Sequence, residues 1–96
     1  MGMCKPSGGI NSVFGPYRHN INETKGEPNS RTDYYDEIRK ILIQQRWFGP
    51  DGWVIWDRDW DHPDQKNTHN FPHDHPWDWS KKKPRQKSVD KNDNYC

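Results

Sequence analysis

Apolar and polar residues alternate in two short stretches near the middle of the chain, and a turn-forming tetrapeptide separates them. The first stretch runs from Lys40 to Phe48 and the second from Trp53 to Trp60. Between them, Gly49-Pro50-Asp51-Gly52 suits a reverse turn, because proline presets φ and glycine adopts the left-handed conformation that closes such a loop. The pattern predicts a β-hairpin with a three-residue connection and a glycine bulge.

The register of this hairpin decides which side chains lie opposite each other. The bulged connection, which is the favoured prediction, places Arg46 opposite Trp56. A plain four-residue loop would shift the register by one and place Arg46 beside Asp57. In either register Asp57 and Asp59 point to the same face, because side chains alternate along a strand.

The segments on either side of this region show no sustained periodic spacing of apolar residues. Residues 1–29 are rich in Gly, Pro, Ser and Asn and are predicted to form a flexible leader or linker. Residues 81–96 begin with a basic run and are predicted to be a flexible tail. Residues 30–80 then form one small, mostly β domain, an antiparallel meander around the Gly49–Gly52 hairpin with disordered N- and C-terminal segments. A small α+β domain is the alternative, although the prolines at 63, 72 and 76 exclude a regular helix between them.

Large aromatic side chains take the place of the missing aliphatic ones. Ile, Leu, Val and Phe number 6, 1, 3 and 3, or 13 of 96 residues. That share, about 14%, is below the ~20% at which disorder is suspected. Most of the tryptophans in the domain are therefore expected to fill the core, and any that stay exposed could stack on unpaired bases. These tryptophans are Trp53, Trp56, Trp60, Trp77 and Trp79.

The net charge of the chain is +1, but positive and negative residues are unevenly distributed along it. Residues 34–79 carry five Lys or Arg against nine Asp or Glu, a sum of −4, and residues 80–96 carry six against two, a sum of +4. An acidic centre should repel a nucleic acid, whereas a basic tail could attract one. A solvated end is the simpler interpretation of the tail.

Four of the five histidines lie between His62 and His75. If His73-Asp74-His75 is extended, both imidazoles project to one side and Asp74 to the other. The residues that could complete a site with this pair are Asp57, Asp59, His62 and His69. The simplest alternative is a polar loop whose histidines only pack on tryptophans.

Two chemistries fit such a site. In metal-free RNA cleavage, His73 and His75, or one of them with His69, act as general base and general acid, and Arg46, Arg58 or Lys66 steadies the phosphorane-like transition state. In a metal site, a divalent cation such as Zn²⁺ is held by imidazole and carboxylate groups. Its candidate ligands are His62, His69, His73, His75 and Asp59. The sequence identifies no cofactor.

Cellular location is only loosely constrained. The longest aliphatic run is Ile41-Leu42-Ile43, so no membrane span or secretory segment is predicted. Cys4 and Cys96 are expected to be free thiols in a reducing compartment. A cytoplasmic protein is expected, unless the domain is delivered elsewhere as part of a larger polypeptide.

The stretch from Gly26 to Ser80, a little over half of the chain, resembles a small domain found at the C-termini of bacterial polymorphic-toxin and phage-associated proteins. The chain departs from this pattern after Tyr35-Asp36, where a glycine is expected and Glu37 to Lys40 stand instead. The residues that carry the resemblance are Gly26, Pro28-Asn29-Ser30, Tyr35-Asp36, Gln45-Arg46-Trp47, Gly49 to Gly52, Asp57-Arg58-Asp59, His62, His69, Pro72-His73-Asp74-His75 and Trp77-Asp78.

The resemblance implies a toxin, commonly a nuclease, with RNA or DNA as substrate and a cognate immunity protein as partner. The favoured hypothesis is therefore a toxin-type ribonuclease that uses His73 and His75, supported by Arg46, Asp57 and Asp59. Substrate contacts are expected from Arg58, Lys66 and His69. The alternative is a non-catalytic metal-binding or interaction module of a phage or mobile element. Oligomeric state is not determined by the sequence.

Overall fold

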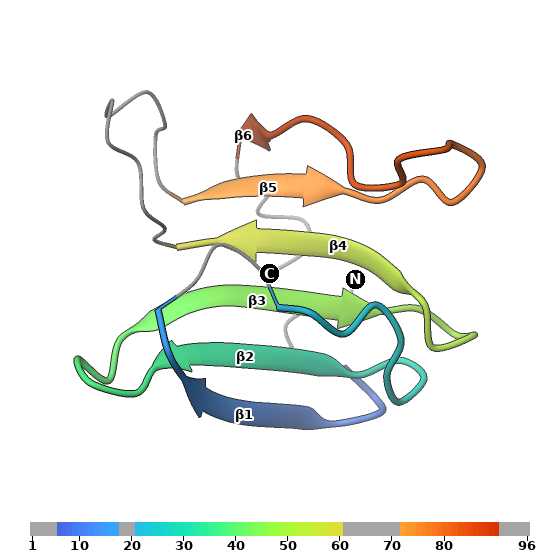
Figure 1. The fold of residues 1–96 in the computed structure, drawn as a ribbon. Helices are drawn as coiled ribbons and strands as arrows, with labels where there is room; N and C mark the ends of the chain where they lie inside the picture. Colours follow the sequence, from blue (N-terminus) through green and yellow to red (C-terminus); the bar gives the residue numbers. More distant parts are fainter. Residues whose placement is uncertain (1–5, 18–20, 61–71, 91–96) are drawn as a thin grey trace.

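Six strands form one sheet in the order β1-β2-β3-β4-β5-β6 in the computed structural model, which describes residues 6–17, 21–60 and 72–90 (Figure 1). The predicted mostly β fold is confirmed, and strands β2 to β6 form the expected antiparallel meander. The described part contains no helix, and so none long and apolar enough to cross a membrane. The strands are β1 (Ile10–Gly15), β2 (Arg31–Asp36), β3 (Leu42–Phe48), β4 (Val54–Asp59), β5 (His73–Pro76) and β6 (Val89–Asp90).

The first strand makes the sheet mixed and corrects the predicted leader. Residues Ile10–Gly15 pair in parallel with Arg31–Asp36, so the domain does not begin at residue 30. Parallel neighbours need a crossover, and the connection from β1 to β2 passes over one face of the sheet in front of β3 (Figure 1). In this connection the Ile21 N–H donates to Gln44 Oε1 at 2.8 Å, and the Ile21 side chain packs with Tyr34 and Ile43. Backbone pairing of this kind does not require alternating apolar residues, so the sequence pattern did not predict this strand.

The basic tail is also partly ordered on the sheet. The Gln86 N–H donates to the Pro76 carbonyl at 2.9 Å, the Asp78 N–H donates to the Pro84 carbonyl at 2.8 Å, and β6 pairs with β5. Residues 84–90 therefore belong to the domain. The predicted boundary at residue 80 is wrong for this segment, because a basic composition does not prevent backbone pairing with an edge strand.

The predicted hairpin is confirmed as β3 and β4, but its favoured register holds only next to the turn. Gly52 has the expected positive φ of 86°, and Phe48 lies opposite Val54. Ile55 is then an extra residue in β4, so Trp47 lies opposite Trp56 and Arg46 opposite Asp57. The second bulge restores the pairing that a plain loop would give. The prediction of Arg46 opposite Trp56 is wrong for this reason.

The turn between β2 and β3 contains a non-glycine residue with positive φ. Lys40 has a φ of 62°, a left-handed conformation that glycine adopts most easily. The Asp36 carboxylate holds this turn: it accepts the Ile38 N–H at 3.0 Å and forms an ion pair with Arg39 at 2.5 Å. The chain therefore makes the expected turn without the expected glycine.

Buried ion pairs lie on both faces of the sheet. Arg46 pairs with Asp57 at 2.6 Å and Arg58 with Asp74 at 2.8 Å, and all four side chains are at most 1% exposed. Because side chains alternate along β4, these two pairs lie on opposite faces. Buried apolar side chains fill the space around the ion pairs; among the described residues they are Ile21, Tyr34, Ile43, Trp47, Phe48 and Val54.

The tryptophans are distributed differently from the expectation that most of them form the core. Trp56, Trp60 and Trp77 are half-buried, while Trp53 and Trp79 stay 38% and 44% exposed. Trp53 and Trp79 therefore lie at the surface, beside the hairpin turn.

Candidate functional site

The pairing of β4 with β5 brings together the carboxylates and imidazoles that the sequence singled out. Asp59 lies opposite His73, and Asp57 lies opposite His75. Since opposed residues share a face, all four side chains stand on the same side of the sheet, and Asp74 points to the other side as predicted. The expectation that both histidines project to one side of the sheet, with Asp74 on the other, is confirmed.

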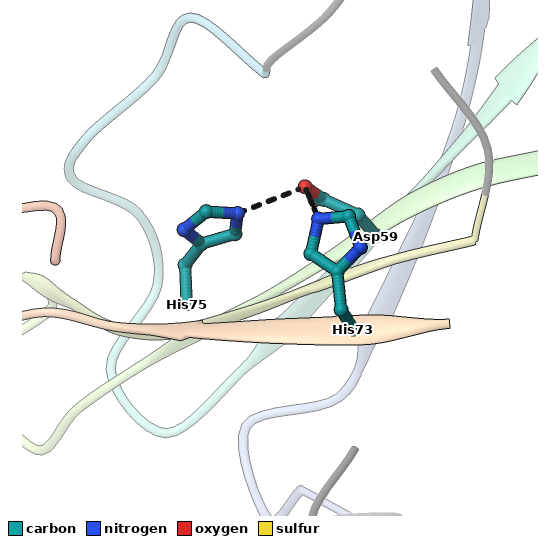
Figure 2. Close-up of side chains that lie close together, drawn as sticks. All are labelled: Asp59, His73 and His75. Carbon is teal, nitrogen blue, oxygen red and sulfur yellow. Dashed lines mark ion pairs between the residues drawn. The ribbon is translucent and has the colours of Figure 1, made fainter. Parts of the chain in front are cut away.

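One oxygen of Asp59 joins the two histidines (Figure 2). His73 Nε2 lies 3.2 Å and His75 Nε2 3.3 Å from Asp59 Oδ2. The rings stand edge to face, with centroids 5.2 Å apart. The three side chains are nearly buried, with exposed fractions of 3% for Asp59, 7% for His73 and 13% for His75. A single carboxylate oxygen therefore lies within ion-pair distance of both imidazoles.

Arg85 completes the cluster from the tail and was not among the predicted site residues. Its Nη2 lies 3.1 Å from Asp59 Oδ2, and its Nε lies 3.0 Å from Asp57 Oδ2. With its side chain 26% exposed, Arg85 is the most accessible member of the cluster. A signal did exist in the sequence: Arg85 stands alone among lysines in the basic run, and guanidinium is the better group for bridging carboxylates.

Neighbouring groups fix the orientation of the acids and of one imidazole. Gln44 Nε2 donates to Asp59 Oδ1 at 2.8 Å, and Trp77 Nε1 donates to Asp57 Oδ2 at 2.9 Å. The Gln86 carbonyl lies 2.8 Å from His75 Nδ1. Because a carbonyl only accepts, His75 Nδ1 must carry a proton in this contact, and the other ring nitrogen, Nε2, faces Asp59.

Asp59 remains ionised far below neutral pH. Burial alone would raise its pKa, but the hydrogen bond to His75, the charge of Arg85 and the hydrogen bond from Gln44 outweigh burial and hold the pKa at about 2. The carboxylate is therefore a permanent negative charge between the two imidazoles under physiological conditions.

Acid titration of unfolding should reveal this carboxylate. Since the folded pKa of Asp59 lies at about 2 against the ordinary aspartate value of 3.8, ionised Asp59 contributes about 2 kcal/mol above about pH 4. This contribution is lost as the pH falls from about 4 to about 2. Urea unfolding of the protein and of Asp59→Asn across that range should show the stability difference shrink by about 2 kcal/mol. A difference that does not change with pH would contradict the lowered pKa.

The other predicted residues divide into three groups. Arg46 is buried, pairs with Asp57 and donates to the carbonyls of Ile21 and Glu23 at 2.6 and 3.0 Å. It therefore supports Asp57 but is not accessible to a ligand. Arg58 points to the opposite face with Asp74, and the expectation that it contacts substrate is wrong because a one-residue step along β4 reverses the face. His62, Lys66 and His69 lie outside the described residues.

The charges of the cluster balance without any further ion. Asp57 and Asp59 contribute two negative charges, and Arg46 and Arg85 contribute two positive ones. Asp36 and Asp74 also pair with arginines, Arg39 and Arg58. Arg39, Arg46 and Arg58 are already counted in the sum of −4 for residues 34–79, so Arg85 is the one paired arginine that adds positive charge from the tail and reduces the excess of acid.

Comparison with protein-family models, curated proteins and solved structures found no significant match to this chain.

Proposed function

We propose that this chain is a toxin-type ribonuclease that uses His73 and His75 as general acid and base without a metal ion. The observation that carries the proposal is the convergence of both Nε2 atoms on one oxygen of Asp59, at 3.2 and 3.3 Å. General acid–base catalysis needs two proton-transfer groups held close together, and a carboxylate is a common device for orienting an imidazole.

The proposed reaction needs one protonated and one neutral histidine. The neutral one removes the ribose 2′-hydroxyl proton while the protonated one donates a proton to the leaving oxygen. His73 and His75 stand edge to face with ring centroids 5.2 Å apart, close enough to act on the two sides of one scissile bond.

Arg85 supplies the cation of the mechanism. Phosphoryl oxygens carry more charge in the transition state than in the bound substrate, so a guanidinium at the site stabilises that state selectively. Arg85 is a better candidate than Arg46 or Arg58, because its side chain is 26% exposed and theirs are 1%.

The test is RNA cleavage with and without a chelator. Cleavage should persist in EDTA and leave 2′,3′-cyclic phosphate ends, and DNA of the same sequence should stay intact because it lacks the attacking hydroxyl. Arg85→Lys should retain part of the activity and Arg85→Gln much less, because lysine keeps the charge. Absence of RNA cleavage by folded protein would refute the proposal.

A metal-binding module is the second candidate, and one observation favours it. The donor atoms of Asp59, His73 and His75 lie within 4.8 Å of one another. Ligands of a tetrahedral zinc ion, with bonds of ~2.0–2.1 Å, lie about 3.3–3.4 Å apart, close to the two nitrogen–oxygen distances here. The charge balance weighs against it, because a dication would face Arg85. Stoichiometric Zn²⁺ uptake that raises Tm, with no RNA cleavage, would establish this candidate.

A cognate immunity protein is the partner that a toxin requires. If the chain is a toxin, the exposed edge of the site around Arg85 is the natural target of inhibition, since an acidic side chain placed there would neutralise the cation. Co-expression with the product of an adjacent reading frame should abolish RNA cleavage and produce a stable complex. RNA cleavage that persists in its presence would argue against that pairing.

A further inference from the structure

Two tryptophans form an open slot beside the hairpin turn. The Trp53 and Trp79 rings have centroids 5.0 Å apart and are inclined by 59°. With Asp51 they line a cavity of about 140 Å³. This is below the ~300–1,000 Å³ of cavities that enclose a small-molecule ligand, so the slot has room for a single flat ring system rather than a whole ligand.

The rings are held in place although they are exposed. Trp79 Nε1 donates to the Val54 carbonyl at 2.6 Å, and Trp79 also packs on Trp77 with centroids 5.5 Å apart. The Trp53 N–H donates to Asp51 Oδ1 at 3.0 Å, which fixes the turn beneath the ring. Rigid exposed aromatics lose little conformational freedom when a ligand stacks on them.

One lysine lies against the slot, and three more follow it in the chain. Lys25 Nζ lies 5.0 Å from the centre of the Trp53 ring. Lys81, Lys82 and Lys83, which follow Trp79 closely in the chain, are all exposed. These four lysines outnumber the one carboxylate that lines the slot, that of Asp51, so an anionic ligand with aromatic rings fits this surface better than a cationic one.

We propose that the Trp53–Trp79 slot binds an unpaired base of a single-stranded nucleic acid, with Lys25 and Lys81 to Lys83 contacting the adjacent phosphates. Stacking on exposed aromatics combined with lysine–phosphate contacts is the usual chemistry of single-strand binding. The binding of a single strand does not depend on the proposed nuclease function. Only the role of the slot, to present single-stranded RNA to the histidine pair, rests on that function.

A chain of contacts joins the slot to the candidate site. Trp79 packs on Trp77, and Trp77 Nε1 donates to Asp57, which in turn contacts Arg85. A strand with a base in the slot that continues along these residues would reach Arg85, whose guanidinium can donate to the next phosphate. Duplex RNA cannot use the slot, because its bases are stacked on one another.

The test is fluorescence anisotropy with a short fluorescein-labelled oligodeoxythymidylate, which cannot be cleaved through a 2′-hydroxyl. The single strand should bind, and the same strand in a duplex should bind more weakly. Trp53→Ala and Trp79→Ala should each weaken binding on the order of 5- to 100-fold. Replacing Lys81, Lys82 and Lys83 by glutamine should reduce the salt dependence, log K against log salt, by up to about 2.

Phe14→Ala is the matched control, because Phe14 is an exposed ring stacked on Tyr35 in the β1–β2 part of the sheet. It should leave binding unchanged. Trp79→Phe, which keeps a stacking ring, should lose less affinity than Trp79→Ala if both variants melt at similar temperatures. Equal binding by folded Trp53→Ala, equal affinity for the duplex, or binding only of an acidic peptide would overturn the proposal. If the protein cleaves RNA but the Trp53 and Trp79 variants bind the oligonucleotide normally, only the slot proposal is overturned. If the protein binds the oligonucleotide through the slot but does not cleave RNA, only the nuclease proposal is overturned.

Discussion

Replacing His75 or His73 by alanine should lower the rate of RNA cleavage by about 10²- to 10⁴-fold, the usual contribution of one proton-transfer group. Both imidazoles approach the same oxygen of Asp59, so removing either leaves one titrating group where the mechanism needs two. The rates should be measured as single-turnover constants on a defined RNA.

The double variant gives the sharper result. Because the two histidines act as a unit, His73→Ala/His75→Ala should be little slower than either single variant, not slower by the product of the two effects. The intact protein should show a bell-shaped pH profile that belongs to the coupled pair, and each single variant should lose one limb. Additive losses with an unchanged pH profile would show that the histidines only support the structure.

Arg46→Met should destabilise the domain by about 3–5 kcal/mol, because it leaves a buried carboxylate without its main partner. Arg46 and Asp57 are at most 1% exposed and share two hydrogen bonds, at 2.6 and 2.9 Å. Small domains have only about 5–15 kcal/mol of stability in total, so this one change consumes much of it. Urea unfolding followed by tryptophan fluorescence measures the loss.

Two other ion pairs serve as comparisons for this effect. Arg58→Met breaks a buried pair on the opposite face, and we expect a similar loss of stability. Arg39→Ala removes an arginine that is 49% exposed, so breaking its pair with Asp36 should cost much less stability than breaking a buried pair. If all three variants lost the same stability, burial would not be the reason for the large effect at Arg46.

The sequence was sufficient to predict which face of the sheet each strand residue occupies, but not which residues lie opposite it on the neighbouring strands. Alternation along β4 and β5 placed Asp57 with Asp59 and His73 with His75, since a period of two fixes the side of the sheet. The turn residues predicted the hairpin, and Gly52 has the positive φ expected of it. These features depend on neighbours in the chain, and local patterns predict them for that reason.

Only the tertiary structure decided which groups meet. The extra residue Ile55 shifts the register of β3 against β4 and pairs Arg46 with Asp57. The pairing of β4 with β5, across a connection that carries no register signal, sets Asp59 opposite His73. Arg85 reaches Asp59 from 26 residues away through backbone pairing of the tail, and β1 joins β2 through a crossover.

The histidine pair itself could therefore be predicted from the amino-acid sequence, together with a mostly β fold around one hairpin. The sequence also offered Asp59 as one of several candidate partners of the pair. The convergence of both imidazoles on one of its oxygens, the arginine that balances it and the exposed Trp53–Trp79 slot could not be predicted. Side-chain direction follows from local backbone geometry, whereas strand register and long-range ion pairs depend on the free energy of the whole sheet.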